Sequence, residues 1–125
     1  SFRRDRGSKM SEKVCCRGEI WMVNFNPGRG SEQKGIRPAL IIQNDIGNRH
    51  ANTTIVAAIT ATIKKYPVTV VLDEHDGGGL KKQSMVNMAQ ILTIDKERLM
   101  KKLGHLKAET ISEVDEAIKN SLDLK

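Results

Sequence analysis

Hydrophobic residues over the first three quarters of the chain alternate with polar residues or form short aliphatic runs, which is the pattern of β-strands. Between Ile20 and Phe25, for example, Trp21 and Val23 fall on the same face as Phe25. The strands that these patterns predict span residues 20–25, 38–43, 53–62, 68–73 and 84–93. Because no helical pattern separates these segments, they predict a small antiparallel barrel or curled sheet.

The end of the chain has helical spacing instead. A final helix is predicted from one apolar stripe, formed by Ile111, Val114, Ile118 and Leu122. A short helix over 96–100, capped by Asp95, is predicted before it. The polar segments 44–48 and 74–79 are rich in turn-forming residues, and they predict a turn and a flexible loop.

Length and composition indicate one globular domain. The chain has 125 residues, of which 38% are hydrophobic and 29% are charged, and no apolar run is long enough to span a bilayer. We interpret residues 1–16 as a disordered extension, in part a tag remnant if Met10 is the native start. Residues 17–125 are interpreted as a single domain.

The formal net charge of +6 permits nucleic-acid binding without locating a binding site. Residues 1–19 contain six basic and three acidic side chains, so half of the excess charge lies at the start of the chain. Affinity for a polyanion depends on how many cations line one groove and not on the total charge.

Cysteine and histidine usage is sparse. Cys15 and Cys16 are adjacent and are the only cysteines, which excludes an internal disulfide framework and a four-thiolate zinc site and favours a reduced, cytoplasmic setting. His50, His75 and His105 show no ligand spacing. We therefore predict no metal ion and no other cofactor.

The segment 26–38 is a glycine-punctuated polar loop that leads into an aliphatic strand, and it is suited to holding a polyanion. Its glycines permit a close approach of the backbone to a ligand. Its basic side chains are Arg29, Lys34 and Arg37, and its neutral hydrogen-bonding side chains include Ser31 and Gln33.

The order Gly30-Ser31-Glu32-Gln33, followed by Gly35-x-Arg37-Pro38, resembles the signature of the MazF/PemK (Kid) family of toxin ribonucleases. The resemblance is not limited to this loop. Further segments in the family's order are Arg17–Trp21, Pro38–Asn48, Ile55–Thr60 and Gln90–Asp95, followed by the last helix. Only the first sixteen residues lie outside the resemblance.

The resemblance implies a fold and an activity. The fold would be mainly β, an SH3-like small antiparallel barrel with a C-terminal helix packed on it. The activity would be that of a sequence-selective, metal-independent endoribonuclease that cuts single-stranded RNA to 2′,3′-cyclic phosphate and 5′-OH ends. The protein would be the toxin of a type II toxin–antitoxin system.

By the same resemblance, the catalytic residues would be Arg37 and Thr60, with Glu32 as base or as the group that orients Arg37. An arginine guanidinium stays protonated and has a fork of donors, so it suits stabilisation of phosphoryl charge better than proton removal. The Thr60 hydroxyl would donate to a non-bridging phosphate oxygen. Taken singly, Arg37 could instead form a surface ion pair, Thr60 be an ordinary strand residue and Glu32 close its loop.

RNA binding would involve the charges of Arg29 and Lys34, and base recognition the polar groups of Ser31, Gln33 and Gln90. The only tryptophan, Trp21, could stack on a base. We expect it in the core instead, because it shares a strand face with apolar residues.

The expected partners are single-stranded RNA, a small acidic antitoxin and a second copy of the chain in a homodimer. Two alternatives remain open at the level of sequence. One is a toxin like CcdB, which shares the fold and binds DNA gyrase through a C-terminal Trp-Gly-Ile; this chain ends instead in Ser121-Leu122-Asp123-Leu124-Lys125. The other is an inactive binding barrel.

Overall fold

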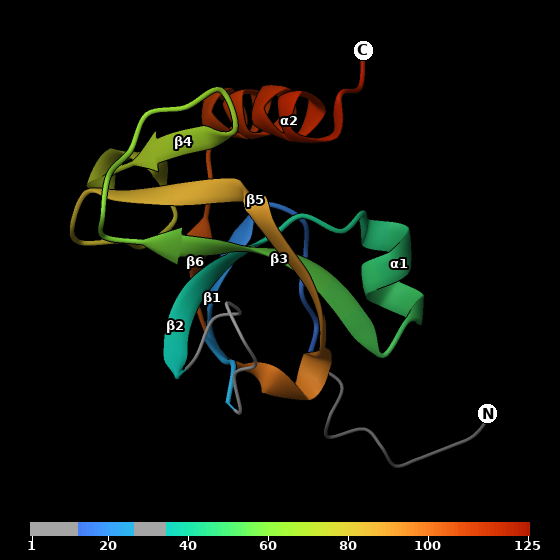
Figure 1. Cartoon of the computed structure of the whole chain (residues 1–125). Coiled ribbons are helices and arrows are strands. Elements are labelled where there is room, and N and C mark those ends of the chain that lie inside the picture. Colours follow the sequence, from blue (N-terminus) through green and yellow to red (C-terminus); the bar gives the residue numbers. More distant parts are fainter. Residues whose placement is uncertain (1–12, 27–34) are drawn as a thin grey trace, which may run out of the picture.

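The computed structural model describes residues 13–26 and 35–125, and the statements below concern that part of the chain. Six strands form one sheet in the order β4-β5-β3-β2-β1-β6 (Figure 1). The strands are β1 (Glu19–Asn24), β2 (Ile36–Ile41), β3 (Thr53–Thr60), β4 (Thr69–Leu72), β5 (Ser84–Asp95) and β6 (Leu99–His105). The helices are α1 (Asp45–His50), α2 (Ala108–Leu122) and the 3₁₀ segments η2 (Glu74–Asp76) and η3 (Lys96–Arg98).

All neighbouring strands pair antiparallel, and the sheet is curled into a half-barrel. The register between β3 and β5 shifts between Ala57 and Ile59, and the register between β1 and β6 shifts twice. Irregularities of this kind bend a strand and increase its twist. Figure 1 shows β5 changing direction midway along its length. The expectation of a curled antiparallel sheet followed by a C-terminal helix is confirmed.

The sheet contains one strand more than the five that the sequence predicts. Residues 96–100 were expected to form a helix, but only η3 is helical and β6 begins at Leu99. This strand was missed because β6 lies at the edge of the sheet. Met100, Lys101 and Lys102 are all exposed, so the strand lacks the alternation that marks a half-buried strand.

The segment 44–48 is also different from expectation, because it is the start of helix α1 and not a simple turn. The side chain of Asn44 caps the helix by accepting a hydrogen bond from the Gly47 N–H at 2.8 Å. Asn48 is buried, and its side-chain oxygen accepts from the Thr54 hydroxyl at 2.6 Å. The turn-forming residues here cap and anchor a short helix.

Two apolar clusters lie on opposite faces of the sheet. The cluster that we call the helix-side core includes Ile20, Leu40 and Ala57 of the sheet and is covered by Val114 and Ala117 of α2. The cluster that we call the opposite core consists of Cys15, Trp21, Val23, Phe25, Ala39, Ile41, Val56, Ile94 and Leu99. Successive residues of β1 thus serve different cores, as the twofold alternation of a strand requires.

Helix α2 packs on the sheet through a narrower stripe than expected. Val114 and Ala117 are buried, and Ile111 and Ile118 pack partly buried against the helix-side core. Leu122, which the sequence places on the same stripe, is 55% exposed. In this last turn the contacts with the sheet side are polar, because Ser121 donates to the Met88 carbonyl at 2.7 Å and Asn120 to the Pro67 carbonyl at 3.0 Å.

The glycine-rich segment after η2 packs tightly against β6. A Cβ atom added to Gly79 would lie 2.2 Å from the Leu103 carbonyl oxygen, and Gly79 also has a φ of +82°. The His105 N–H donates to the Gly77 carbonyl at 3.0 Å. The glycines expected to give a flexible loop therefore allow a close backbone contact.

Candidate active site

Arg37 is the second residue of β2, so it opens a strand as the sequence predicts. Its backbone is in register with Val23 of β1, and its side chain is exposed. An exposed guanidinium at a strand end is accessible to a ligand from solvent.

Thr60 is the last residue of β3, the neighbour of β2 in the sheet. The register of these two strands places Ala39 opposite Ala58. Continued by two residues, it would place Arg37 opposite Thr60, and residues two apart on a strand share a face. The paired register ends at Ala39, directly after Pro38, which has no N–H to donate. The two predicted catalytic residues thus lie at neighbouring strand ends and on one face.

Gln90 lies in β5, half-buried, where the register between β5 and β3 shifts. Leu92, two residues further along, packs against the opposite core, as does Ala39. Met88, two residues before Gln90, belongs instead to the helix-side core, so the orientation of β5 changes across this shift and alternation assigns Gln90 to neither face. The described site residues Arg37, Thr60 and Gln90 come from three adjacent strands.

The base of the glycine loop is held together by hydrogen bonds. The Gly35 N–H donates to the side-chain oxygen of Asn26 at 2.9 Å. The Phe25 N–H donates to the Gly35 carbonyl at 2.8 Å. Gly35 has a φ of +75°, a conformation that favours glycine. The residues on either side of positions 27–34 are thereby joined directly.

Arg98 is part of the same base, although sequence reasoning gave it no role. Its Nη1 donates to the Asn24 carbonyl at 2.9 Å and also to the Asn26 carbonyl. Asn26 and Arg98 are 72 positions apart, and no local sequence pattern connects such residues. Only the register that places Leu99 opposite Val23 brings Arg98 to this end of β1.

The other predicted site residues lie outside the described part of the chain. They are the catalytic candidate Glu32 and the RNA-binding candidates Arg29, Ser31, Gln33 and Lys34.

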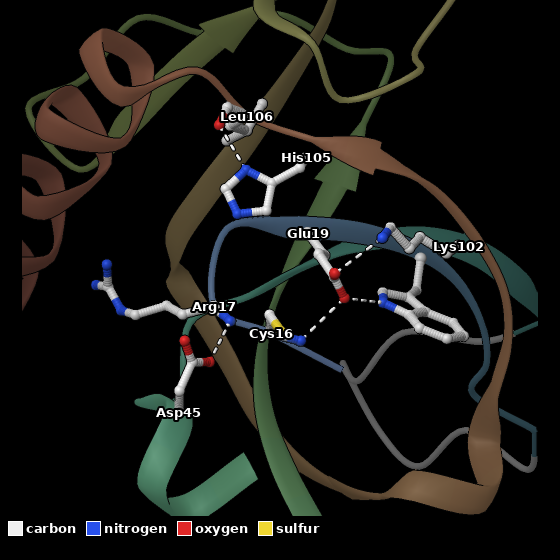
Figure 2. A network of polar contacts seen from close by, with 8 residues as sticks. Cys16, Arg17, Glu19, Asp45, Lys102, His105 and Leu106 are labelled. Carbon is white, nitrogen blue, oxygen red and sulfur yellow. Dashed lines mark hydrogen bonds and ion pairs between the residues drawn. The ribbon is translucent and has the colours of Figure 1, made fainter. Parts of the chain in front are cut away.

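At the opposite end of β1, Glu19 is the centre of a buried polar network (Figure 2). Its carboxylate accepts hydrogen bonds from the Trp21 indole N–H and the Cys16 N–H, both at 2.9 Å. Its other oxygen pairs with the Lys102 ammonium at 3.0 Å. Trp21 itself is 8% exposed and belongs to the opposite core, which confirms the expectation that it packs in the core.

The protonation of Glu19 reflects two opposing effects. Burial raises the pKa of the carboxyl group, but hydrogen bonds from Trp21, Cys16 and Lys102 lower it by more. The net pKa lies below its ordinary value, so the group is held as a carboxylate. This motif residue thus has a role in folding.

Arg17, the first residue of the resemblance, joins separate parts of the fold. Its N–H donates to the Asp45 side chain at 2.7 Å (Figure 2), and its guanidinium pairs with Asp115 of α2 at 2.9 Å. The Arg17 N–H is the main cause of the lowered pKa of Asp45. These contacts connect the start of the domain to α1 and α2.

A cleft of about 790 Å³ lies elsewhere, between residues 13–16, α1 and residues 95–97, and includes no predicted site residue. Within residues 13–26 and 35–125, no group of three or more His, Cys, Asp or Glu side chains could hold a metal ion. In the same part of the chain, no helix has the length and apolar character needed to cross a membrane.

Residues 16–122 match the family described as PemK-like, MazF-like toxin of type II toxin–antitoxin system, and the chain belongs to this family. Its enzyme class is endoribonuclease. A relative from Bacillus subtilis (strain 168), endoribonuclease EndoA, is 48% identical over 110 residues, which cover 86% of this chain and 94% of the relative.

Solved structures agree with the fold. The crystal structure of MazF (Form-I) from Deinococcus radiodurans is 26% identical with a TM-score of 0.75, covering 90% of this chain and 99% of that chain. An endoribonuclease in complex with its cognate antitoxin, from Mycobacterial species, is 25% identical with a TM-score of 0.76, covering 89% of this chain and 97% of that chain.

Proposed function

We propose that this toxin cuts single-stranded RNA, sequence-selectively and without a metal ion, and leaves 2′,3′-cyclic phosphate and 5′-OH ends. The observation that carries the proposal is the β2–β3 register, which brings Arg37 opposite Thr60 when it is continued by two residues to these neighbouring strand ends. RNA contains its own nucleophile, the 2′-OH, so the protein has to stabilise phosphoryl charge and move protons. An exposed guanidinium and a nearby hydroxyl supply suitable donors.

In this mechanism the 2′ oxygen attacks the adjacent phosphorus, and the bond from phosphorus to the 5′ oxygen breaks. Arg37 donates to the phosphoryl oxygens, where charge increases in the transition state, and Thr60 donates to a non-bridging oxygen. Glu32, beyond the described residues, takes the 2′ proton, or it orients Arg37 while water takes that proton. The leaving 5′ oxygen receives a proton from Arg37 or from water, which gives the 5′-OH end. Gln90, on the adjacent strand β5, contributes to recognition of a base.

The antitoxin partner is part of the same proposal. The mycobacterial relative binds its cognate antitoxin, and a structure from Deinococcus radiodurans is described as MazE-MazF. We infer that a small acidic antitoxin occupies the RNA groove of this chain and that the active form is a cytoplasmic homodimer. Sedimentation of the purified protein tests the dimer.

The reaction is tested by incubating the purified protein with single-stranded RNA in excess EDTA. We expect cleavage to persist and the products to carry cyclic phosphate. A substrate with hydrogen in place of the 2′-OH at the scissile nucleotide should bind but stay intact, because it lacks the nucleophile. A strict requirement for added Mg²⁺ or Zn²⁺, or 5′-phosphate on the products, would contradict the mechanism. Absence of cleavage with gyrase inhibition would favour the CcdB-like alternative.

Antitoxin inhibition is tested by competition between an acidic antitoxin peptide and RNA. We expect the peptide to displace RNA and to lose part of its affinity as salt is raised, since ion pairs at a basic rim are screened. A variant with Arg29 and Lys34 changed to Ala should show a weaker salt dependence. Simultaneous binding of both ligands with unchanged affinities would show that inhibition does not occur at this groove.

A further inference from the structure

We propose that Arg98 is a positioning residue for RNA cleavage, acting through the backbone at the end of β1 on the placement of Arg37. The inference rests on the proposed function, because Arg37 is taken as the group that stabilises phosphoryl charge. The Arg98 guanidinium reaches this segment through backbone carbonyls of Asn24 and Asn26.

The first step of the argument is the contact made by the guanidinium. Nη1 of Arg98 donates to the carbonyl oxygens of both Asn24 and Asn26. Asn24 is the last residue of β1, and its side-chain oxygen also accepts from the Asn26 N–H at 3.0 Å. One charged donor thus fixes the two carbonyls where the chain leaves the sheet. Hydrogen bonds to a charged group contribute more than neutral ones.

The second step connects this segment to β2. Asn26 accepts from the Gly35 N–H through its side chain, and Phe25 donates to the Gly35 carbonyl. Gly35 is followed directly by Ile36, which is in register with Asn24. The chain that leads into Arg37 is therefore held on both sides of Gly35 by residues that Arg98 braces.

The third step is the consequence for catalysis. Electrostatic stabilisation requires a donor placed before the reaction occurs, and a misplacement of about 1 Å can cost about a hundredfold in rate. Without Arg98, two backbone carbonyls lose a charged donor, and the backbone near Gly35 becomes less restrained. The guanidinium of Arg37 is then less well placed, although it is still present.

The test compares Arg98→Ala, Arg98→Lys and Arg98→Gln with the full-length wild-type protein, using single-turnover cleavage, RNA affinity and its salt dependence. Arg98→Ala should lower the cleavage rate about 10- to 100-fold and change the RNA Kd less than about threefold. Arg98→Lys and Arg98→Gln keep an N–H donor and should recover part of the rate. Lys119→Ala, which removes a basic side chain from the exposed side of α2, is the control and should cleave normally.

A phosphate contact would produce a different pattern. If Arg98 bound RNA directly, its loss would weaken RNA affinity and reduce the salt slope by about 1, and Arg98→Gln would not recover activity. That result, or an unchanged cleavage rate in Arg98→Ala, would overturn the proposal.

Asn26→Ala provides an independent check, because it removes the bond to the Gly35 N–H and leaves Arg98 intact. If both residues act through one connection, the double variant should cleave little more slowly than the slower single variant. Fully additive losses would contradict a shared connection.

A readout without RNA separates this proposal from the proposed function. The Gly35 amide should exchange with solvent faster in Arg98→Ala and in Asn26→Ala than in the wild type. If the Gly35 amide exchanged at the wild-type rate in Arg98→Ala, the positioning role of Arg98 would be overturned, even if RNA cleavage were impaired. Failure of the wild type to cut RNA, or full activity of Arg37→Ala, would overturn the proposed function. The Gly35 exchange rates would then still decide whether Arg98 restrains the backbone at the end of β1. If Arg98→Ala does not fold, the Lys and Gln variants supply both readouts.

Discussion

The two ends of β1 use charged residues in different ways. At the start of the strand, Glu19 is 5% exposed and accepts from Trp21, Cys16 and Lys102. Beside the other end, Arg37 is exposed on the paired strand. The first charge is enclosed by the fold, whereas the second is presented to solvent.

This difference separates a structural motif residue from one that is suited to the proposed function. A buried carboxylate costs desolvation, which its hydrogen bonds must offset, so it is sensitive to the loss of any partner. An exposed guanidinium incurs little of this cost, and its planar fork of donors suits recognition of a phosphate. Both residues lie in motifs shared with the family, but their surroundings suit them to different tasks.

The largest expected effect is that of Arg37→Ala on catalysis. We expect the cleavage rate to fall at least about a hundredfold, as for removal of a transition-state donor. The melting temperature should remain close to that of the wild type, because the side chain is exposed. Single-turnover cleavage and thermal unfolding measure the two quantities. Near-normal cleavage would move the active site away from this end of the sheet.

Glu19→Ala should have the opposite profile. The buried Trp21 N–H and the partly buried Cys16 N–H would lose their acceptor, so we expect the free energy of unfolding to fall by about 2 kcal/mol. Lys102→Ala should cost less, since that side chain is half exposed. Urea denaturation gives the free energies, and cleavage per folded molecule should be nearly unchanged. A variant as stable as the wild type but inactive would reverse the assignment of the two ends.

A smaller effect is expected for the hydroxyl of Thr60. Thr60→Val keeps the shape and removes the donor, so it should slow cleavage at least about tenfold. Thr60→Ser keeps the hydroxyl and should retain most of the rate. Equal rates for the two variants would show that the side chain serves the strand and not the reaction.

The smallest effect concerns pH. Because the folded pKa of Glu19 is lowered, its carboxylate stabilises the protein above the unfolded pKa of about 4.3, and this contribution is lost as the pH falls toward the folded pKa. The difference in unfolding free energy between wild type and Glu19→Gln should therefore shrink from pH 7 to pH 3. The lowered pKa values of Asp45 and Asp76 affect both proteins alike. A constant difference would contradict the role given to the Glu19 charge.

Sequence patterns predicted the parts of the fold in which burial alternates. The strand containing Trp21 and the helix containing Val114 were found because one face of each is apolar. Strand β6 was missed because Met100 and its two neighbours are all exposed, and α1 was missed because its capping residues are also turn formers.

For the candidate site, the sequence could supply residue types and a family motif, and their catalytic roles stay a prediction. Arg37 and Thr60 were proposed on that basis, and the sheet places them at neighbouring strand ends. Arg98 could not be found in this way, because its partners are backbone carbonyls distant in the sequence. Every residue has a backbone carbonyl, so the sequence does not indicate which carbonyls accept a hydrogen bond.

The unclosed sheet has a consequence for solubility. Within the described residues its edges are β4, which is only four residues long, and β6, which carries the exposed pair Lys101 and Lys102. The far part of β6 is occupied by the contact between His105 and Gly77. Short edges, lysines and covered backbone all oppose strand addition from another molecule. The half-barrel can therefore remain open at its edges without offering a template for aggregation.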